Sequence, residues 1–287
     1  MRRLRHEQNY MRKDLERIDP RGHATDLFTD WAVDFVRAQQ HALQPFFLYL
    51  AYNAPHTPIQ PPQEWVDRVR GREPDASPER VKYVALVEHL DYGIGKVLDA
   101  LEATGQLSNT LVIYTSDNGG QMNVGATNGP YRGEKGDMYE GGIRVPTCVR
   151  WPGEIEDGCV TDTPAMLMDL FPTVCDAVGV PVGHGIEGQS ILPTLKGEAQ
   201  DFSDRILYWI RREGSQRFLG LCQHAVRRGD VKLLHNSPFE PLELYDLGDD
   251  PYETTDHSKA DQDTFGEMSR ILQAEMQVNG SVPWLRA

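Results

Sequence analysis

Residues 111–120, LVIYTSDNGG, join an apolar stretch directly to a polar, glycine-rich turn. The run from Leu111 to Thr115 has the length and composition of a buried strand. Asp117 and Asn118 follow at the point where that strand ends, and they place a carboxylate beside a carboxamide. Oxygen ligands of this kind suit a hard cation such as Ca²⁺ or Mg²⁺. Asn-Gly is also a common hairpin turn, so these residues alone leave a metal site and a tight turn open.

Helices and strands are predicted to alternate on either side of this stretch. Apolar residues recur at helical spacing over 24–40 and 78–104, and the second helix has Ser77 as a capping residue at its start. Between them, the run 46–52, FFLYLAY, predicts a short buried central strand. This alternation is typical of an α/β fold in which helices flank a mostly parallel sheet.

The second half of the sequence changes character near residue 200. The stretch 143–151, IRVPTCVRW, predicts a strand near a sheet edge because a proline interrupts it, and 165–179 predicts a helix. Short strand-like runs separated by turn residues then predict a small antiparallel sheet. The expected division is an α/β domain over residues 1–198, followed by an antiparallel-sheet and helix subdomain over residues 199–287.

Composition excludes several classes of protein. A net charge of −14 argues against a nucleic-acid partner, because phosphate binding needs clustered Lys and Arg. No apolar run approaches the ~20 residues of a membrane-spanning helix. The basic start has no apolar segment behind it, so it does not read as a signal peptide. The cysteines show neither a disulfide framework nor zinc-finger spacing, which predicts buried, reduced thiols.

Two further residues are candidates for chemistry. In open α/β sheets, ligands bind beyond the carboxyl ends of the strands, which selects the loop with His56 as well as the loop with Asp117. His56 lies in the stiff proline frame APHTP, which suits a positioned acid or base, although a lone histidine is often structural. Lys135 lies among glycines in YRGEKGDMYEGG, where its ammonium could pair with an anion or simply be solvated.

Taken together, five stretches resemble the sulfatase family of arylsulfatase type, within the alkaline phosphatase superfamily. In order, they are PFFLYLAYNAPHTP, VIYTSDNGG, YRGEKGDMYEGGIRVP, DLFPTVCDAVG and LYDLGDDPYE. The resemblance implies a sulfuric ester hydrolase that works by nucleophilic displacement at sulfur. It implies that Asp117 and Asn118 ligate Ca²⁺, with Mg²⁺ as the second choice. It also implies that His56 and Lys135 bind the sulfate ester and act in catalysis, with His56 able to protonate the leaving oxygen.

The sequence departs from the family pattern in one respect. Sulfatases carry C-x-P-S-R, or a serine variant, whose Cys or Ser becomes the formylglycine nucleophile. None of the four cysteines here has that context, and the paired N-terminal Asp metal ligands are also absent. We therefore expect a truncated or split sulfatase, inactive by itself, whose partner is a missing N-terminal segment or chain. A phosphoesterase of the same superfamily and a non-catalytic sulfatase-fold protein are the alternatives. Sulfatases are mostly exported proteins, but the sequence leaves the localisation open.

Overall fold

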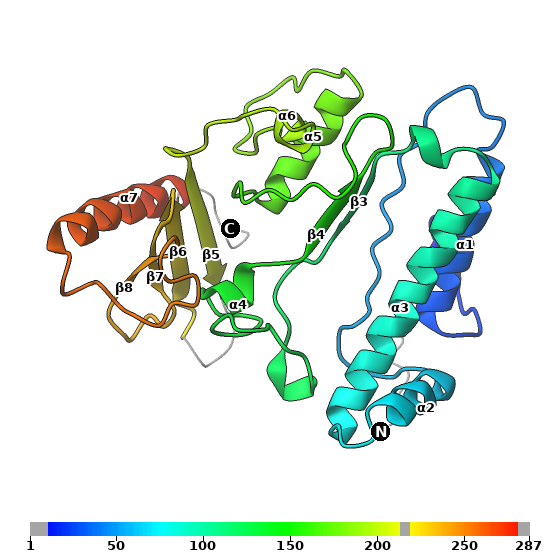
Figure 1. The fold of residues 1–287 in the computed structure, drawn as a ribbon, viewed down its shortest axis with the longest axis horizontal. Helices are drawn as coiled ribbons and strands as arrows, with labels where there is room; N and C mark the ends of the chain where they lie inside the picture. The colour runs from blue at the N-terminus through cyan, green and yellow to red at the C-terminus, as the bar shows by residue number, and fades with distance from the viewer. Residues whose placement is uncertain (1–10, 213–218, 281–287) are drawn as a thin grey trace. The chain divides into compact units, whose positions relative to one another are not determined.

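Three helices build the first of the two units into which the chain divides, Met1–Thr110 and Leu111–Ala287 (Figure 1). The computed structural model describes residues 11–212 and 219–280. The helices are α1 (Ala24–Ala38), α2 (Gln63–Arg72) and α3 (Pro78–Ala103). A hairpin of β1 (Met11–Lys13) and β2 (Glu16–Ile18) precedes them, and the 3₁₀ helix η1 (Leu107–Asn109) follows. The division of the sequence at residue 198 stays a prediction.

Both helices predicted in this unit are confirmed. Helix α3 begins as expected, because Ser77 Oγ accepts a hydrogen bond of 3.2 Å from the N–H of Arg80. Helices α1 and α3 approach closely at Gly93, where a Cβ atom would lie 2.5 Å from Thr29 Oγ1. Helix α2 packs on α3 through a buried apolar cluster. Its members are Trp65, Val66, Val69, Val81 and Ala85.

The prediction of a buried central strand at residues 46–52 is wrong. This segment has no strand partner among the described residues, and Phe47 and Tyr49 are exposed. The alternate side chains instead contact helix α1. The ring of Phe46 meets Phe35 edge-on at 5.6 Å, and the hydroxyl of Tyr52 bonds that of Thr29 at 2.7 Å. An apolar run of this length thus covers a helix here without joining a sheet.

The expected parallel sheet does not appear among the described residues. Strands β3 (Val112–Thr115) and β4 (Thr147–Arg150) pair antiparallel as a two-stranded sheet, and β3 is only half-buried. The 3₁₀ helix η2 (Met122–Val124), the short helix α4 (Glu140–Ile143) and loops connect them. Two parallel neighbouring strands need a crossover that brings the chain back to the end of the sheet where the first strand began. The connection between β3 and β4 makes no such return, so β4 runs in the opposite direction to β3.

The helix predicted at 165–179 is confirmed as the 3₁₀ turn η3 (Leu167–Asp169) running into α5 (Leu170–Ala177). Helix α6 (Leu192–Leu195) packs beside it. Asp169 is fully buried and forms a two-pronged ion pair with Arg205, at 2.5 Å and 3.0 Å. This pair fixes the turn against the residue that precedes the next strand.

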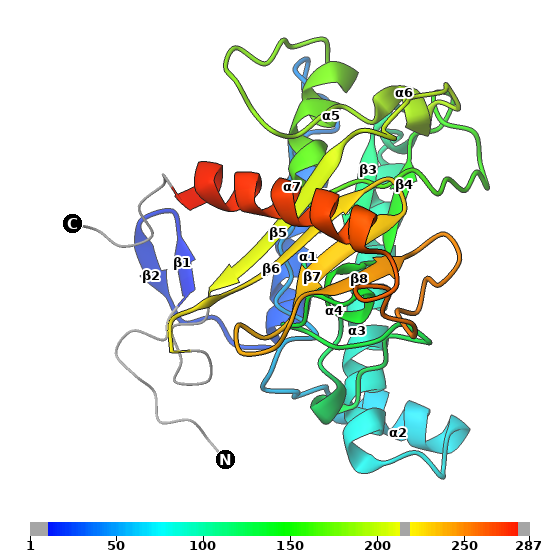
Figure 2. The ribbon, with the colours of Figure 1, turned by 90° about the vertical axis from the view of Figure 1, so that its left-hand side faces the viewer.

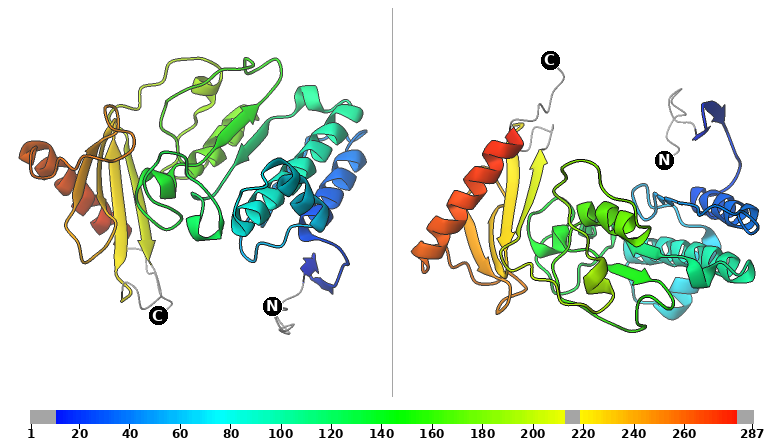
Figure 3. Two further views of the ribbon diagram at one scale, coloured as in Figure 1. Left: turned by 60° about the horizontal axis from the view of Figure 1, so that its bottom comes forward. Right: turned by 90° about the horizontal axis from the view of Figure 1, so that it is seen from above.

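The C-terminal antiparallel sheet is confirmed, with four strands in sequential order. They are β5 (Ile206–Arg212), β6 (Cys222–Arg228), β7 (Val231–His235) and β8 (Glu243–Asp246). Helix α7 (Gln262–Gly280) lies along one face of this sheet (Figures 2 and 3). Val226, Leu233 and Leu244 pack there with Met268 and Leu272. On the opposite face, Ala225, Leu234 and Tyr245 pack with Met138 and Tyr139, which precede α4. The sheet is therefore a middle layer that carries the glycine-rich segment on its second face.

Two composition-based expectations have different outcomes. The cysteines are unpaired, but the prediction of buried thiols is wrong, because Cys148 and Cys159 are exposed and Cys175 and Cys222 are half-buried. Cys148 and Cys222 lie on strands β4 and β6, Cys159 lies in a loop and Cys175 lies in helix α5. In the described part of the chain, no helix has the length and apolar character needed to cross a bilayer.

Buried His224 predicts a pH-dependent stability of the C-terminal sheet. Burial, with a smaller contribution from His235, lowers the pKa of His224 from 6.5 to about 4, and its Nδ1 bonds Tyr208 at 2.8 Å. Between these two values the unfolded chain binds more protons, so the free energy of unfolding falls as the pH drops from 6.5 towards 4. A lowering of the His224 pKa by this amount corresponds to at most ~3 kcal/mol of unfolding free energy. We expect His224→Gln to flatten urea-unfolding stability over this range, and the exposed His184→Gln control to leave it unchanged. Equal pH dependence in His224→Gln and the wild type would contradict the assignment.

Candidate functional site

The polar loop after β3 is not a two-residue hairpin turn. The partner of β3 begins only at Thr147, so the Asn-Gly sequence does not connect two paired strands. Asp117 is exposed and Asn118 is half-buried, and Ser116 Oγ donates to the backbone carbonyl of Asn118 at 3.1 Å. The oxygen-bearing side chains at 117 and 118 therefore follow the strand end in an open loop.

Glycines hold this loop directly against the backbone of the segment around α4. Gly119 N–H donates to Gly142 O at 2.9 Å, and a Cβ atom at Gly119 would lie 1.8 Å from Gly141 O. Gly141 N–H in turn donates to Arg132 O at 2.7 Å, and a Cβ there would lie 2.4 Å from Gly133 O. No side chain fits between these backbone segments, so glycine is required at Gly119 and Gly141.

Lys135 is joined to the same loop by hydrogen bonds. Its backbone N–H donates to Gly120 O at 3.1 Å. The side chain of Asn128 spans the two segments, because it accepts from Gly120 N–H at 2.7 Å and donates to Gly133 O at 3.0 Å. The ammonium of Lys135 is exposed and pairs with no described acidic residue. The structure thus brings the loop of Asp117 and Asn118 together with the loop of Lys135.

His56 belongs to the other unit, where its ring orientation is fixed locally. Its Nδ1 lies 2.8 Å from Thr57 O, and its backbone N–H donates to Asn53 O at 2.9 Å. A carbonyl oxygen only accepts, so Nδ1 carries the proton and Nε2 is the basic nitrogen. The ring is exposed, and the proline bonds on either side, Ala54–Pro55 and Thr57–Pro58, are cis. That His56 shares a site with Asp117 and Lys135 stays a prediction.

A buried ionic cluster, not predicted from the sequence, attaches the glycine-rich segment to the C-terminal sheet. Lys232 of β7 is fully buried, and its Nζ lies 2.8 Å from Glu140 Oε1 and 2.8 Å from Glu253 Oε1. The second oxygen of Glu253 accepts from the backbone N–H of Glu140 at 2.7 Å. Burial raises the pKa of the Glu253 carboxyl, although Lys232 acts in the opposite direction. Glu140 is the first residue of α4, so this cluster fixes the backbone that leads into Gly141 and Gly142, the two residues that contact Gly119.

Arg132 adds a second attachment between the same elements. Its guanidinium lies 3.9 Å above the Tyr139 ring, and it donates to the Tyr245 hydroxyl at 2.7 Å. It also donates to the backbone carbonyl of Glu253 at 3.1 Å. The Tyr139 hydroxyl donates to Glu243 at 2.7 Å, and burial together with this carboxylate raises the Tyr139 pKa strongly. Both tyrosines therefore stay neutral and act as hydrogen-bonding parts of the scaffold.

The oxygen atoms of Asp117 and Asn118 fit Ca²⁺ in chemical type. Ca²⁺ takes ~6–8 oxygen ligands, so these two residues are a minority of a complete site. Within the described residues, Asp117 does not belong to any group of three acidic, His or Cys ligands. A calcium ion held here needs further oxygen ligands, such as water, backbone carbonyls or other side-chain oxygens.

Comparison with known proteins identifies the family. A family model described as Sulfatase matches residues 3–180, well over half of the chain. The chain belongs to the sulfatase family. A second model, described as N-sulphoglucosamine sulphohydrolase, C-terminal, matches residues 133–279 of this sulfatase chain.

Individual relatives agree with this assignment. A sulfatase of Formosa agariphila is 34% identical over 253 residues, which covers 81% of this chain and 45% of that protein. An N-acetylgalactosamine-6-sulfatase of Mus musculus is 36% identical over 195 residues, covering 65% of this chain and 36% of that protein. The crystal structure of Ps i-CgsB in complex with k-i-k-neocarrahexaose superposes with a TM-score of 0.83 at 31% identity. It covers 91% of this chain and 56% of that one. The chain thus spans about half the length of its relatives, or less.

Removing the cation of the buried cluster is expected to destabilise the protein strongly. Lys232→Met leaves Glu140 and Glu253 buried beside each other without their shared counter-charge, since the half-exposed Arg144 reaches only Glu140, at 3.8 Å. The loss should cost ~3–5 kcal/mol of unfolding free energy. Urea denaturation measures the change. A triple neutral variant, Lys232→Met with Glu140→Gln and Glu253→Gln, should recover much of the loss. The exposed control Lys259→Met should stay within about 0.5 kcal/mol of the wild type. Equal stability of Lys232→Met and Lys259→Met would refute the role of the cluster.

Proposed function

We propose that this chain forms part of a sulfuric ester hydrolase in which Lys135 and His56 contact the sulfate group. In this proposal Asp117 and Asn118 hold Ca²⁺. The observation that supports it best is the hydrogen-bonded contact between the loop of Asp117 and Asn118 and the loop of Lys135. A lysine whose backbone is held against the loop that carries possible metal ligands suits a negatively charged, tetrahedral ester group.

Each residue has a distinct part in the proposed reaction. The exposed ammonium of Lys135 pairs with a non-bridging sulfate oxygen and stabilises the charge that grows there in the transition state. His56 keeps its Nδ1–H on Thr57 O, so a proton taken up at Nε2 can pass to the leaving oxygen. Asp117 and Asn118 would hold the metal through their side-chain oxygen atoms. When bound, Ca²⁺ supplies further positive charge to the sulfate.

The nucleophile must come from outside the motifs present in these residues. The cysteines stand in CVRW, CVTD, CDAV and CQHA, and none has the C-x-P-S-R context of a formylglycine precursor. Formylglycine supplies the attacking hydroxyl in sulfatases. We therefore propose that the 287 residues bind and orient a sulfate ester, and that a further segment or chain completes the enzyme.

The alternative function is that of a phosphoesterase, and a panel of substrates distinguishes it from a sulfuric ester hydrolase. Phosphonate monoester hydrolases share this fold, for example one from Agrobacterium radiobacter at a TM-score of 0.66 and 20% identity. That degree of identity carries the fold alone. The panel therefore pairs a chromogenic aryl sulfate with the matching aryl phosphate.

Activity should depend on a completed chain. We expect no aryl sulfate turnover by the 287 residues alone, because general acid help gives only ~10²–10⁴-fold while enzymes reach ~10⁶-fold or more. Joining a segment that carries C-x-P-S-R and the paired Asp ligands, expressed with the formylglycine-generating machinery, should restore turnover. In that enzyme, Lys135→Ala and His56→Ala should each lower kcat/KM by ~10²-fold or more.

Matched controls make this experiment decisive. Lys259→Ala and His41→Ala remove an exposed lysine and an exposed histidine elsewhere and should leave kcat/KM unchanged. Asp117→Ala should lower activity in a way that added Ca²⁺ partly restores. Full activity of Lys135→Ala and His56→Ala would refute the site, and preference for the phosphate ester would refute the reaction.

A further inference from the structure

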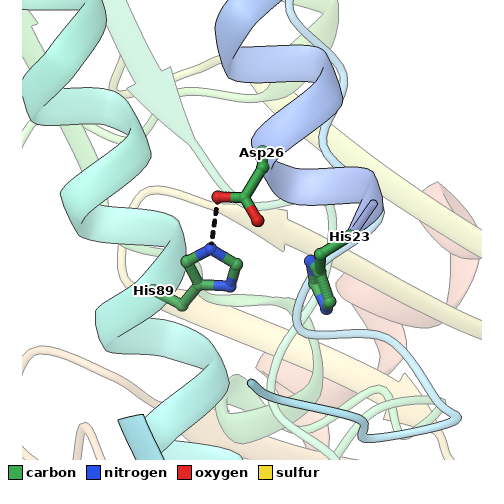
Figure 4. A group of neighbouring side chains, drawn as sticks. All are labelled: His23, Asp26 and His89. Atoms are coloured by element: carbon green, nitrogen blue, oxygen red, sulfur yellow. Dashed lines mark hydrogen bonds and ion pairs between the residues drawn. The ribbon is translucent and has the colours of Figure 1, made fainter. Parts of the chain in front are cut away.

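Three side chains outside the proposed sulfate site converge at the start of α1. His23 caps α1, Asp26 lies in its first turn, and His89 reaches them from α3 (Figure 4). One potential ligand atom of each residue lies within 4.8 Å of the others. Among residues 11–212 and 219–280, this is the single such grouping of three His, Cys, Asp or Glu side chains.

His89 presents a buried nitrogen that nothing in the described structure satisfies. The residue is 2% exposed, and Trp65 stacks on its ring at 5.5 Å. Its Nε2 lies 2.8 Å from Asp26 Oδ1. A carboxylate only accepts, so Nε2 carries the proton. Nδ1 is buried and has no hydrogen-bond partner among the described residues. In the neutral ring it is a bare lone pair, and Figure 4 shows it on the side that faces His23.

His23 has the same arrangement of proton and lone pair. Its Nδ1 accepts a long hydrogen bond of 3.2 Å from the N–H of Thr25, so Nδ1 is unprotonated and the proton is on Nε2. Nε2 then donates to the backbone carbonyl of Gln60 at 3.1 Å. Each imidazole therefore gives its Nε2–H to an oxygen; the Nδ1 lone pair of His89 has no partner, and that of His23 holds only the long bond from Thr25. Ligating histidines in metal sites show this pattern, with the second nitrogen bonded to a carboxylate or carbonyl.

We propose that His23 and His89, with Asp26 supporting His89, bind a divalent transition-metal ion of the Zn²⁺ type. The two imidazoles ligate through Nδ1, while Asp26 keeps its Oδ1 bond to Nε2 of His89 and orients that ring. Two imidazole nitrogens suit Zn²⁺, and water molecules complete four-fold coordination. Imidazole ligands favour this class over Ca²⁺ or Mg²⁺, which take oxygen ligands.

The two imidazole rings lie close enough to share an ion. Bonds of ~2.0–2.1 Å place two ligand atoms of a tetrahedral Zn²⁺ about 3.3 Å apart. The ring centroids of His23 and His89 lie 4.7 Å apart, and Nδ1 of His89 faces His23. His89 is fixed by burial, but the side chain of His23 is half-buried. Rotation of His23 brings its Nδ1 to the ion, and His23 then exchanges its weak bond from Thr25 for the metal.

The experiment titrates the metal-free full chain with Zn²⁺ by calorimetry and with Co²⁺ by visible absorption. We expect one ion per chain and Co²⁺ bands of a four-coordinate site. Asp26→Asn, which loses the charged support of His89, should weaken Zn²⁺ binding by ~10–100-fold. His23→Asn should weaken it at least as much, and asparagine keeps a side-chain acceptor at the helix cap, so α1 stays folded.

Controls separate this site from other binding. His41→Asn removes an exposed histidine of the same unit, and Asp117→Ala removes a ligand of the proposed Ca²⁺ site, so both should bind Zn²⁺ as the wild type does. Circular dichroism confirms that each variant is folded. Absence of stoichiometric binding in the wild type would overturn the proposal. So would folded His23→Asn and Asp26→Asn variants with unchanged Zn²⁺ affinity and Co²⁺ spectra, because the ion would then lie elsewhere.

Discussion

The buried contact of Lys232 with Glu140 and Glu253 is the interaction on which the arrangement of the larger unit depends. A lysine without exposure to water is costly unless it is paired, and here two carboxylates and a backbone N–H complete the cluster. Lys232 lies on the sheet face that also carries Leu234, so apolar packing and the ion pairs act at the same face. The start of α4 is thereby fixed to strand β7.

The proposed site follows from that attachment through backbone contacts. Once Glu140 is fixed, Gly141 and Gly142 have defined positions, and Gly119 must approach them without a side chain between. The loop of Asp117 and the loop of Lys135 then share hydrogen bonds. Rigid positioning of this kind is what a charged substrate requires, since misplaced charges stabilise a transition state poorly. Stability and the proposed chemistry are therefore coupled through a single cluster that contacts no substrate.

Much of the local structure could be predicted from the sequence, whereas long-range pairing could not. The helices at 24–40, 78–104 and 165–179 and the C-terminal sheet have periodic patterns and clear end signals. The run 46–52 has the composition of a strand, but strand pairing depends on residues distant in the sequence. Its side chains pack on helix α1 and the run pairs with no described strand. The antiparallel pairing of β3 with β4 could not be inferred either. The connection between them is long, and its sequence does not determine whether the second strand runs parallel or antiparallel to the first.

The candidate sites show the same limit. Asp117, Asn118 and Lys135 lie in glycine-rich motifs that can be recognised locally. Lys232 is one lysine in a strand-like run, and nothing nearby indicates that it is buried. His23 and His89 are distant in sequence, and only the packing of α1 on α3 brings them together.

Amide hydrogen exchange tests the coupling between cluster and site most directly. Peptides that contain Gly119, Lys135 and Gly142 should exchange slowly in the wild type, with protection similar to that of β7. In Lys232→Met at a temperature where the protein remains folded, protection should fall in those peptides and in β7 together, while α1 and α3 keep theirs. If the loops of Asp117 and Lys135 keep full protection when Lys232 is replaced, the buried cluster does not position the site and the account is wrong.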